Sequence, residues 1–188
     1  PAYARNNQIR EINNIFLTSP DKLIESCKGK FAHLNTLITR KSLFLATSGM
    51  DEHIRYECEW DLYLRLCESA KSVLFCPKYI ARHNVPNPAA NVNVSTGMPF
   101  LRKMLYRTTV LDKALMFNNM PTIRIMAATH KIYTLKKIAE HLAENHKYRE
   151  AVFYAREAAI RPIDIKWRIY TALLQIKALL SNRSKESA

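Results

Sequence analysis

Glycine is scarce in this sequence. The 188 residues include three glycines, Gly29, Gly49 and Gly97, where an average composition of about 7% would supply roughly 13. A loop that cradles phosphate groups with its backbone N–H groups needs several closely spaced glycines. The sequence therefore excludes a glycine-rich phosphate-binding loop within this chain.

Cysteines are also few, and long apolar runs are missing. The four cysteines, Cys27, Cys58, Cys67 and Cys76, are too few and too widely spaced for a disulfide scaffold or for the paired ligands of a zinc site. We interpret them as reduced thiols, which predicts a cytoplasmic protein. No apolar run reaches the roughly 18 residues needed to cross a bilayer, and the N-terminus has no signal-peptide pattern. The first residue is Pro1 rather than methionine, which indicates either removal of residues by processing or, as we expect, a piece of a longer protein.

The net charge of +13 is unevenly distributed along the chain. Residues 1–99 contain 12 basic and 9 acidic side chains, a net charge of +3, whereas residues 100–188 contain 17 and 7, a net charge of +10. Such a basic field favours an anionic partner, and nucleic acid, an acidic membrane surface and phosphorylated ligands all qualify. Charge alone does not choose among them.

The hydrophobic pattern changes its period near residue 98. Before that point it predicts strands over residues 31–40 and 71–82, the second bent at Pro77, with a short helix or turn around 41–49, a helix over 56–69 and a loop over 83–97. After it, the pattern predicts helices at 98–118, 121–143, 147–160 and 164–181, then a disordered tail. We therefore expect an α/β domain over residues 1–97 and a basic all-α extension over residues 98–188.

Two features of the helical half carry specific expectations. Small residues at positions 139, 143, 151, 155 and 158 have the spacing of a helical hairpin similar to one tetratricopeptide unit, without a second copy. The last helix has two neighbouring apolar stripes, one of Ile169, Leu173, Ile176 and Leu180 and one of Trp167, Tyr170, Leu174 and Ala178. So wide an apolar face needs burial against the hairpin, a membrane interface or a second copy of the chain, and we expect the hairpin.

The stretch YECEWDLYLRLCES, residues 56–69, places three carboxylates, Glu57, Glu59 and Asp61, ahead of a leucine pattern with helical spacing. Acidic side chains in a first turn complement the positive end of the helix dipole, so helix initiation is a sufficient explanation of all three. Asp61 is also placed to pair with Arg65 one turn along. A catalytic use of these carboxylates therefore needs support from the surrounding sequence.

That support comes from the order of short motifs. An SGMDE turn at residues 48–52 follows an arginine-containing segment, CEWDLYLRL begins a helix at residue 58, and a further segment ends in Arg82 and His83. This order, over roughly residues 30–95, resembles the acceptor-side half of a family 2 inverting glycosyltransferase of the GT-A type. The resemblance implies a Rossmann-like α/β fold for the first half. It also implies transfer of a sugar from a nucleotide-sugar donor to a hydroxyl of a saccharide or lipid-linked acceptor.

By the same resemblance, Glu59 is the catalytic base. The acceptor hydroxyl attacks the anomeric carbon in line with the departing diphosphate, and a carboxylate within hydrogen-bond reach must take its proton. The chain departs from the family pattern at two positions, because Glu59 stands where the family usually has aspartate and Cys58 where it has glutamate. Glu57 and Asp61 therefore stay open as alternative bases.

The resemblance implies further site residues. Asp51, Glu52 and Trp60 would bind the acceptor, although a tryptophan at this position is also suited to a hydrophobic core. Arg82 would neutralise diphosphate charge, and a neutral His83 could ligate a divalent cation, Mg²⁺ or Mn²⁺. An exposed loop residue without a ligand is the alternative for His83.

The nucleotide-binding half and the Asp-x-Asp metal motif of this family precede the resembling segment, and neither occurs in these 188 residues. Catalysis would need a preceding segment. The leading hypothesis is part of a glycosyltransferase whose helical extension contacts an anionic membrane surface or a protein partner. A non-catalytic interaction module is the second. A nucleic-acid-binding helical domain is the third, supported only by charge, because no recognition motif for nucleic acid is visible.

Overall fold

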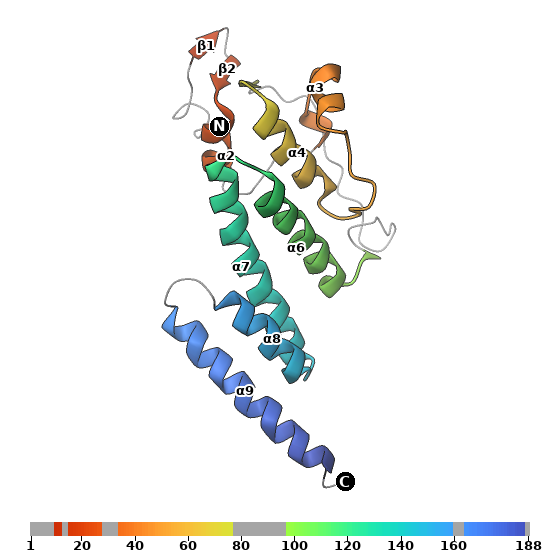
Figure 1. The fold of residues 1–188 in the computed structure, drawn as a ribbon, viewed down its shortest axis with the longest axis vertical. Coiled ribbons are helices and arrows are strands. Elements are labelled where there is room, and N and C mark those ends of the chain that lie inside the picture. Colours follow the sequence, from red (N-terminus) through yellow and green to blue (C-terminus); the bar gives the residue numbers. More distant parts are fainter. Residues whose placement is uncertain (1–9, 13–14, 28–33, 77–96, 160–163, 187–188) are drawn as a thin grey trace.

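The computed structural model describes residues 10–12, 15–27, 34–76, 97–159 and 164–186. This part of the chain is mostly helical and elongated, and it runs from a small sheet at one end to the last helix at the other (Figure 1). Its helices are α2 (Pro20–Cys27), α3 (Lys41–Ala46), α4 (Cys58–Ser69), α6 (Phe100–Phe117), α7 (Pro121–Glu144), α8 (Tyr148–Ala158) and α9 (Ile165–Glu186). The strands are β1 (Arg10–Ile12), β2 (Ile15–Thr18) and β3 (Val73–Phe75), and η1 (Leu34–Thr36) is one turn of 3₁₀ helix.

The Rossmann-like α/β fold expected for residues 1–97 is wrong. The sheet has the order β1-β2-β3, and both of its strand pairs are antiparallel. A Rossmann-like domain needs parallel strands joined by crossover helices, and no parallel pair occurs in the part of the chain that the structure describes. The expectation came from motifs on a turn and a helix start, and such motifs do not fix the direction in which strands pair.

The two predicted strands have different outcomes. Residues 34–40 form η1 and irregular backbone, so the strand predicted over residues 31–40 is wrong where the structure describes it. β-Branched residues favour a strand only where a neighbouring strand offers a partner. Val73–Phe75 confirms a short part of the strand predicted over residues 71–82. Residues 71, 72 and 76 are not part of a strand, so the prediction is wrong there. Residues 77–82 of that prediction, and residues 83–96 of the predicted loop, lie outside the described residues.

The helical predictions are confirmed, with one change at the C-terminus. The helix over 56–69, the short helix near 41–49 and all four helices after residue 98 are present within a few residues of the expected bounds. Helix α9 continues to Glu186, so the disordered tail predicted from residue 181 is wrong up to that residue. Extending an existing helix is far easier than starting one, and this part of the tail includes arginine, lysine and glutamate, which are good helix formers.

One hydrophobic cluster joins the two halves of the sequence. Ile24 from α2 and Leu64 from α4 pack with Leu111 from α6 and Ile123 from α7. Helix α4 thereby lies against α6, and α2 lies against the first turns of α7 (Figure 1). Residues on both sides of the predicted boundary at 97 and 98 therefore share a core, and α6 brings its polar side chains to the start of α4.

A second cluster confirms the predicted hairpin of α7 and α8. Ala139 on α7 and Ala151, Ala155 and Ala158 on α8 are buried in it. Such small side chains let the two helix backbones approach closely. His146, with a φ of 58°, lies in the turn between the helices. The alanine spacing that indicated the hairpin is thus the spacing that its core uses.

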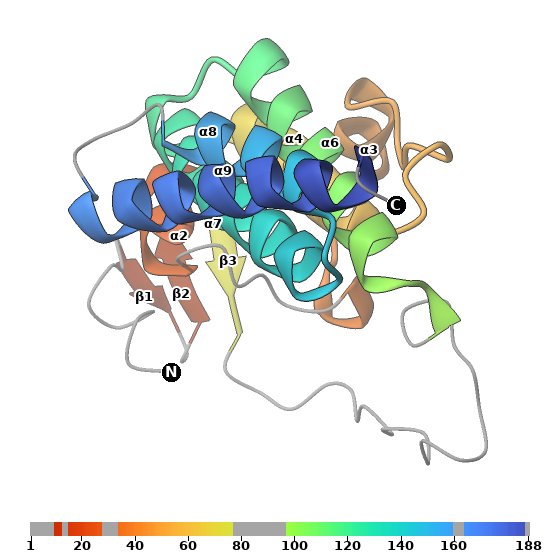
Figure 2. The same ribbon diagram turned by 90° about the horizontal axis from the view of Figure 1, so that it is seen from below.

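Helix α9 packs on α8 through one of its two apolar stripes. Trp167 and Leu174 are buried, and the indole N–H of Trp167 donates a hydrogen bond to the carbonyl of Ala155 at 3.0 Å. Ile169 and Leu173, from the other stripe, are 56% and 53% exposed. The expectation that the hairpin buries both stripes is therefore wrong. The reason is geometric, because the hairpin lies on one side of α9 only, and seen from below α9 is in front of the other described helices (Figure 2).

Candidate functional site

The turn before α4 is shaped by two left-handed residues. Ser48 and Gly49 have φ values of 61° and 63°, and the N–H of Gly49 donates to the carbonyl of Phe44 at 3.0 Å, closing α3. A Cβ on Gly49 would lie 3.0 Å from the ring of Phe44. The positive φ favours glycine, and the close approach of the Phe44 ring leaves little room for a side chain. The turn directs the following residues, including Asp51, toward α6.

Glu57 occupies the N-cap position of α4, but its side chain does not cap the helix. Its backbone is left-handed, with a φ of 61°, and its carbonyl accepts the N–H of Trp60 at 2.9 Å. The buried carboxylate accepts hydrogen bonds from Nε of Arg107 on α6, at 2.9 Å to Oε1 and 2.8 Å to Oε2. These bonds raise the pKa of Arg107 above its ordinary value. Glu57 is thus the acidic partner of a cation in the interface between α4 and α6.

Asp61 is the most deeply buried carboxylate of the group, at 3% exposure. Nε of Arg65 donates to it at 2.9 Å, and Nζ of Lys113 on α6 lies 2.9 Å from its other oxygen. The guanidinium of Arg65 also donates to the carbonyl of Thr47. The predicted pairing of Asp61 with Arg65 is confirmed, and a second cation from α6 completes it.

Lys113 links Asp61 to the turn. Its ammonium group contacts Asp51 at 2.7 Å. The hydrogen bond from Lys113, followed by one from the backbone N–H of His53, lowers the pKa of Asp51. Asp51, Glu57 and Asp61 therefore all stand beside cations, and these ion pairs fix the start of α4 against α6.

Glu59 differs from these three carboxylates. Within the described part of the chain, no lysine, arginine or histidine forms an ion pair with it. Its Oε2 lies 3.6 Å from the Sγ of Cys58, which donates its S–H to it. Burial and then the charge of Glu59 raise the pKa of the Cys58 thiol, so this donor stays protonated. Half-buried Glu59 is thus the carboxylate of this group that has no cationic partner among the described residues.

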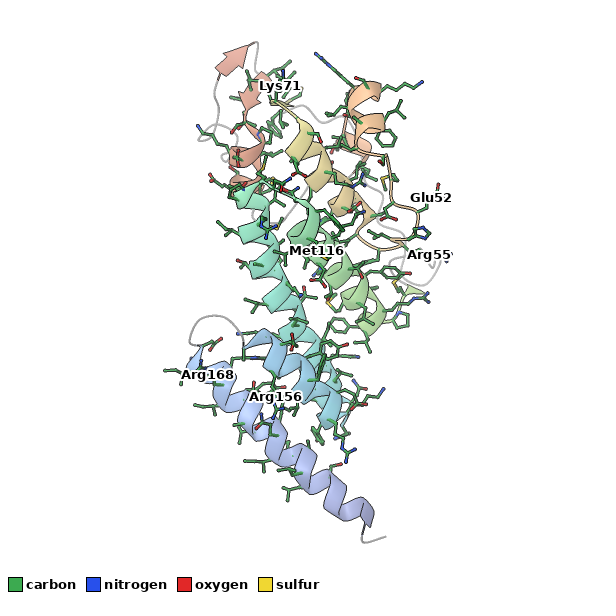
Figure 3. All side chains as sticks on the ribbon, in the orientation of Figure 1. Glu52, Arg55, Lys71, Met116, Arg156 and Arg168 are labelled. Carbon is green, nitrogen blue, oxygen red and sulfur yellow. The ribbon has the colours of Figure 1, made fainter. Side chains whose placement is uncertain are left out.

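The remaining predicted site residues lie in different surroundings. Trp60 packs beside the cluster between α4 and α7, where its ring meets that of His130 edge-on at 5.6 Å and lies 5.7 Å from the guanidinium of Arg107. Glu52 is exposed on the loop before α4 (Figure 3). Arg82 and His83 lie outside the described residues.

Among the residues that the structure describes, no set of side chains could serve as the ligands of the predicted divalent cation. Groups of three or more His, Cys, Asp and Glu side chains suited to a cation are absent there. Asp51, Glu57 and Asp61 already have Lys or Arg partners, which compete with a metal ion for the same oxygens. The carboxylates at the start of α4 therefore do not fit a divalent cation.

Sequence reasoning missed the two cations that α6 contributes. Arg107 belongs to the stripe of α6 that also contains Met104, Leu111 and Ala114, all three of them buried. A charged residue within an otherwise apolar stripe indicates a buried partner of opposite charge. That signal was present for Arg107. Lys113 lies outside the stripe, and only the folded chain shows its role.

Comparisons place no further constraint on this site. We found no match among protein-family models, curated protein sequences or solved structures. The described helices also all fall short of the length or hydropathy that a transmembrane span requires. The interpretation of the site therefore rests on its own geometry.

Proposed function

We propose that the chain is part of a cytoplasmic transferase that moves a sugar from a nucleotide-sugar donor to an acceptor hydroxyl with inversion, and that Glu59 is its general base. One observation supports this assignment over its alternatives. Glu57 and Asp61 are held by arginine and lysine side chains, whereas Glu59 has no cationic partner in the described residues. Carboxylate oxygens that already accept hydrogen bonds from arginine or lysine are occupied, whereas a general base needs an oxygen within hydrogen-bond reach of the acceptor hydroxyl.

The proposed reaction balances without any other group from this chain. The acceptor O–H loses its proton to a carboxylate oxygen of Glu59 while its oxygen forms a bond to the anomeric carbon. The bond from that carbon to the donor's diphosphate breaks at the same time, and the nucleoside diphosphate leaves with the electron pair. Attack opposite to the leaving group inverts the configuration.

The surrounding residues would orient the base rather than react. The ion pairs of Glu57 and Asp61 anchor the first turn of α4 to α6, and the thiol of Cys58 donates to Glu59. A base held on an anchored helix start keeps its geometry better than one on a loop. Exposed Glu52 is accessible to a saccharide or lipid-linked acceptor, with Asp51 and Trp60 nearby in sequence. Donor and diphosphate binding, by Arg82 and by residues beyond these 188, belongs to the same proposal, as does a divalent cation bound through His83.

The test is a transfer assay on the protein as its gene encodes it, with a panel of nucleotide sugars and released nucleoside diphosphate as the readout. We expect Glu59→Gln to lower turnover by at least about 10², because general-base catalysis typically contributes 10²–10⁴. Glu25→Gln, the same change on an exposed position of α2, is the matched control and should leave turnover unchanged. Near-normal turnover of Glu59→Gln would disprove the base assignment, and a folded protein that releases no nucleoside diphosphate from any donor would disprove the transferase.

A non-catalytic interaction module is the second candidate. The observation in its favour is the exposed apolar stripe of α9, which lies at the opposite end of the molecule from the sheet (Figure 1). A correctly folded protein without transfer activity, but with a binding activity that depends on α9, would support this candidate instead.

A further inference from the structure

The side of α9 that faces away from α8 is apolar from Ile165 to Leu180. Six large aliphatic side chains on it are each between 53% and 66% exposed: Ile165, Ile169, Leu173, Ile176, Leu179 and Leu180. At about 100° per residue they fall within an arc of roughly 120°. We call this arc the outer face of α9. A contiguous apolar patch of this kind on a folded chain indicates a surface that something else covers.

Basic side chains border the outer face on both edges. Lys166 and Lys177 lie along one edge and Arg168 along the other, at the helical angles that follow from their positions. All three are exposed, and no ion pair to any of them occurs in the part of the chain that the structure describes. The ammonium of Lys177 lies 5.8 Å from the ring of Tyr148, a weak contact that leaves it at the surface. Between residues 165 and 181, α9 has no acidic residue.

The opposite side of α9 is fully used by the fold. Trp167, Thr171 and Leu174 are buried against α8, and Asp164 caps the start of the helix by accepting the N–H of Trp167 at 3.1 Å. Helix α9 is the outermost element at its end of the molecule, with α8 between it and the rest (Figures 1 and 2). Arg168, on the first turns of α9, is exposed, whereas Arg156 comes from α8 (Figure 3). The outer face therefore points away from the protein along its whole length.

We propose that the outer face of α9 binds the surface of an anionic lipid bilayer, with the helix axis in the plane of the membrane. The aliphatic side chains would enter the boundary between headgroups and acyl chains, and the flanking Lys and Arg stems would extend to the phosphates. Charge complementarity decides between this occupant and a second copy. Two outer faces brought together would gather six cations without a carboxylate between them, whereas an anionic bilayer offers negative charge along both edges. The +10 charge of residues 100–188 adds long-range attraction to the same surface.

This proposal is tested with the 188-residue chain and lipid vesicles in a sedimentation assay. We expect strong binding to phosphatidylcholine vesicles containing about 30% phosphatidylserine and little binding to phosphatidylcholine alone. Binding should fall as salt rises from about 0.05 M to about 0.5 M, because the Debye length shortens. Equal binding to both lipid compositions, or binding to neither, would overturn the proposal.

Variants separate the outer face from charge in general. The double variant Ile169→Asp with Leu173→Asp should lose at least about tenfold in vesicle binding while keeping its helix content and thermal midpoint, because both residues are exposed. Ile125→Asp, at an equally exposed aliphatic position on α7, is the matched control and should bind normally. Lys166→Gln and Lys177→Gln should each weaken binding about fivefold, the factor that corresponds to about 1 kcal/mol per lysine.

Three results would contradict the assignment. Unchanged binding of the double aspartate variant would show that the outer face does not contact lipid. A concentration-dependent dimer that the same variant abolishes would assign the face to a second copy. Tighter binding to RNA or DNA than to anionic vesicles, unaffected by the double variant, would show that only the net charge matters. None of these readouts depends on sugar transfer, so failure here leaves the proposed activity of Glu59 untouched.

Discussion

The start of α4 and the outer face of α9 use charge in opposite ways. At α4, carboxylates face a neighbouring helix, and Arg107 and Lys113 from α6 meet them there. At α9, the cations Lys166, Arg168 and Lys177 face solvent, and the described residues offer them no ion pair. A charge at a helix–helix contact is bound within the fold, whereas one beside an exposed apolar face is available to a partner. Glu59 lies at α4, but like the cations of α9 it has no ion pair among the described residues.

Adjacent residues on α9 give the sharpest test of its two faces. Leu174 is 3% exposed and Leu173 is 53% exposed. Leu174→Ala should lower the free energy of unfolding by about 2–5 kcal/mol, because it leaves a cavity between α8 and α9. Leu173→Ala should change it by less than about 0.5 kcal/mol. Urea unfolding of both variants measures the difference, and equal losses would mean that α9 buries both stripes in solution.

The carboxylates of α4 provide a second comparison, of intermediate size. Asp61→Asn should lower the free energy of unfolding by about 1.5–3 kcal/mol, because it removes the charge that Arg65 and Lys113 share. Glu59→Gln should change it by less than about 0.5 kcal/mol, because no ion pair is lost. Thermal unfolding near neutral pH separates the two. A Glu59→Gln variant as unstable as Asp61→Asn would show that Glu59 is structural.

The sequence predicted the helical elements well and the packing between them poorly. Helical periodicity located α4 and α6 to α9, and alanine spacing identified the α7–α8 hairpin, because both signals are local. The direction of strand pairing depends on segments distant in sequence, so the motif resemblance gave the wrong fold class. The acidic start of α4 was visible as a group of carboxylates. Which of them is free depended on Arg107 and Lys113, about 50 residues away along the chain. Which of the two apolar stripes of α9 packs on α8 likewise depends on how the two helices meet in the folded chain.

The smallest effect on stability is expected from Asp164, a carboxylate at the start of α9 that forms an ion pair within the fold. Its carboxylate contacts Nζ of Lys136 on α7 at 2.5 Å and caps α9 through the N–H of Trp167. The bond from Lys136, and then that from Trp167, lower the pKa of Asp164. A lowered pKa means that the folded state binds its proton less readily than the unfolded state does. The stabilisation is therefore fully present above the ordinary aspartate pKa of about 3.9, and it is lost as pH falls through the lower pKa of the folded state.

Asp164→Asn keeps an oxygen that can cap α9 but removes the charge. Its thermal midpoint should lie slightly below that of the parent near neutral pH. The two midpoints should converge as pH falls from about 3.9 through the lower pKa of Asp164 in the folded state, where the parent also loses the charge. Lys136→Gln should reduce the same pH dependence, because Lys136 is the main cause of the lowered pKa. Thermal unfolding followed by circular dichroism at a series of pH values measures both variants. Parent and Asp164→Asn curves that stay parallel down to the lowest pH would show that the contact with Lys136 does not stabilise α9, and that its docking depends on the stripe of Trp167 and Leu174 alone.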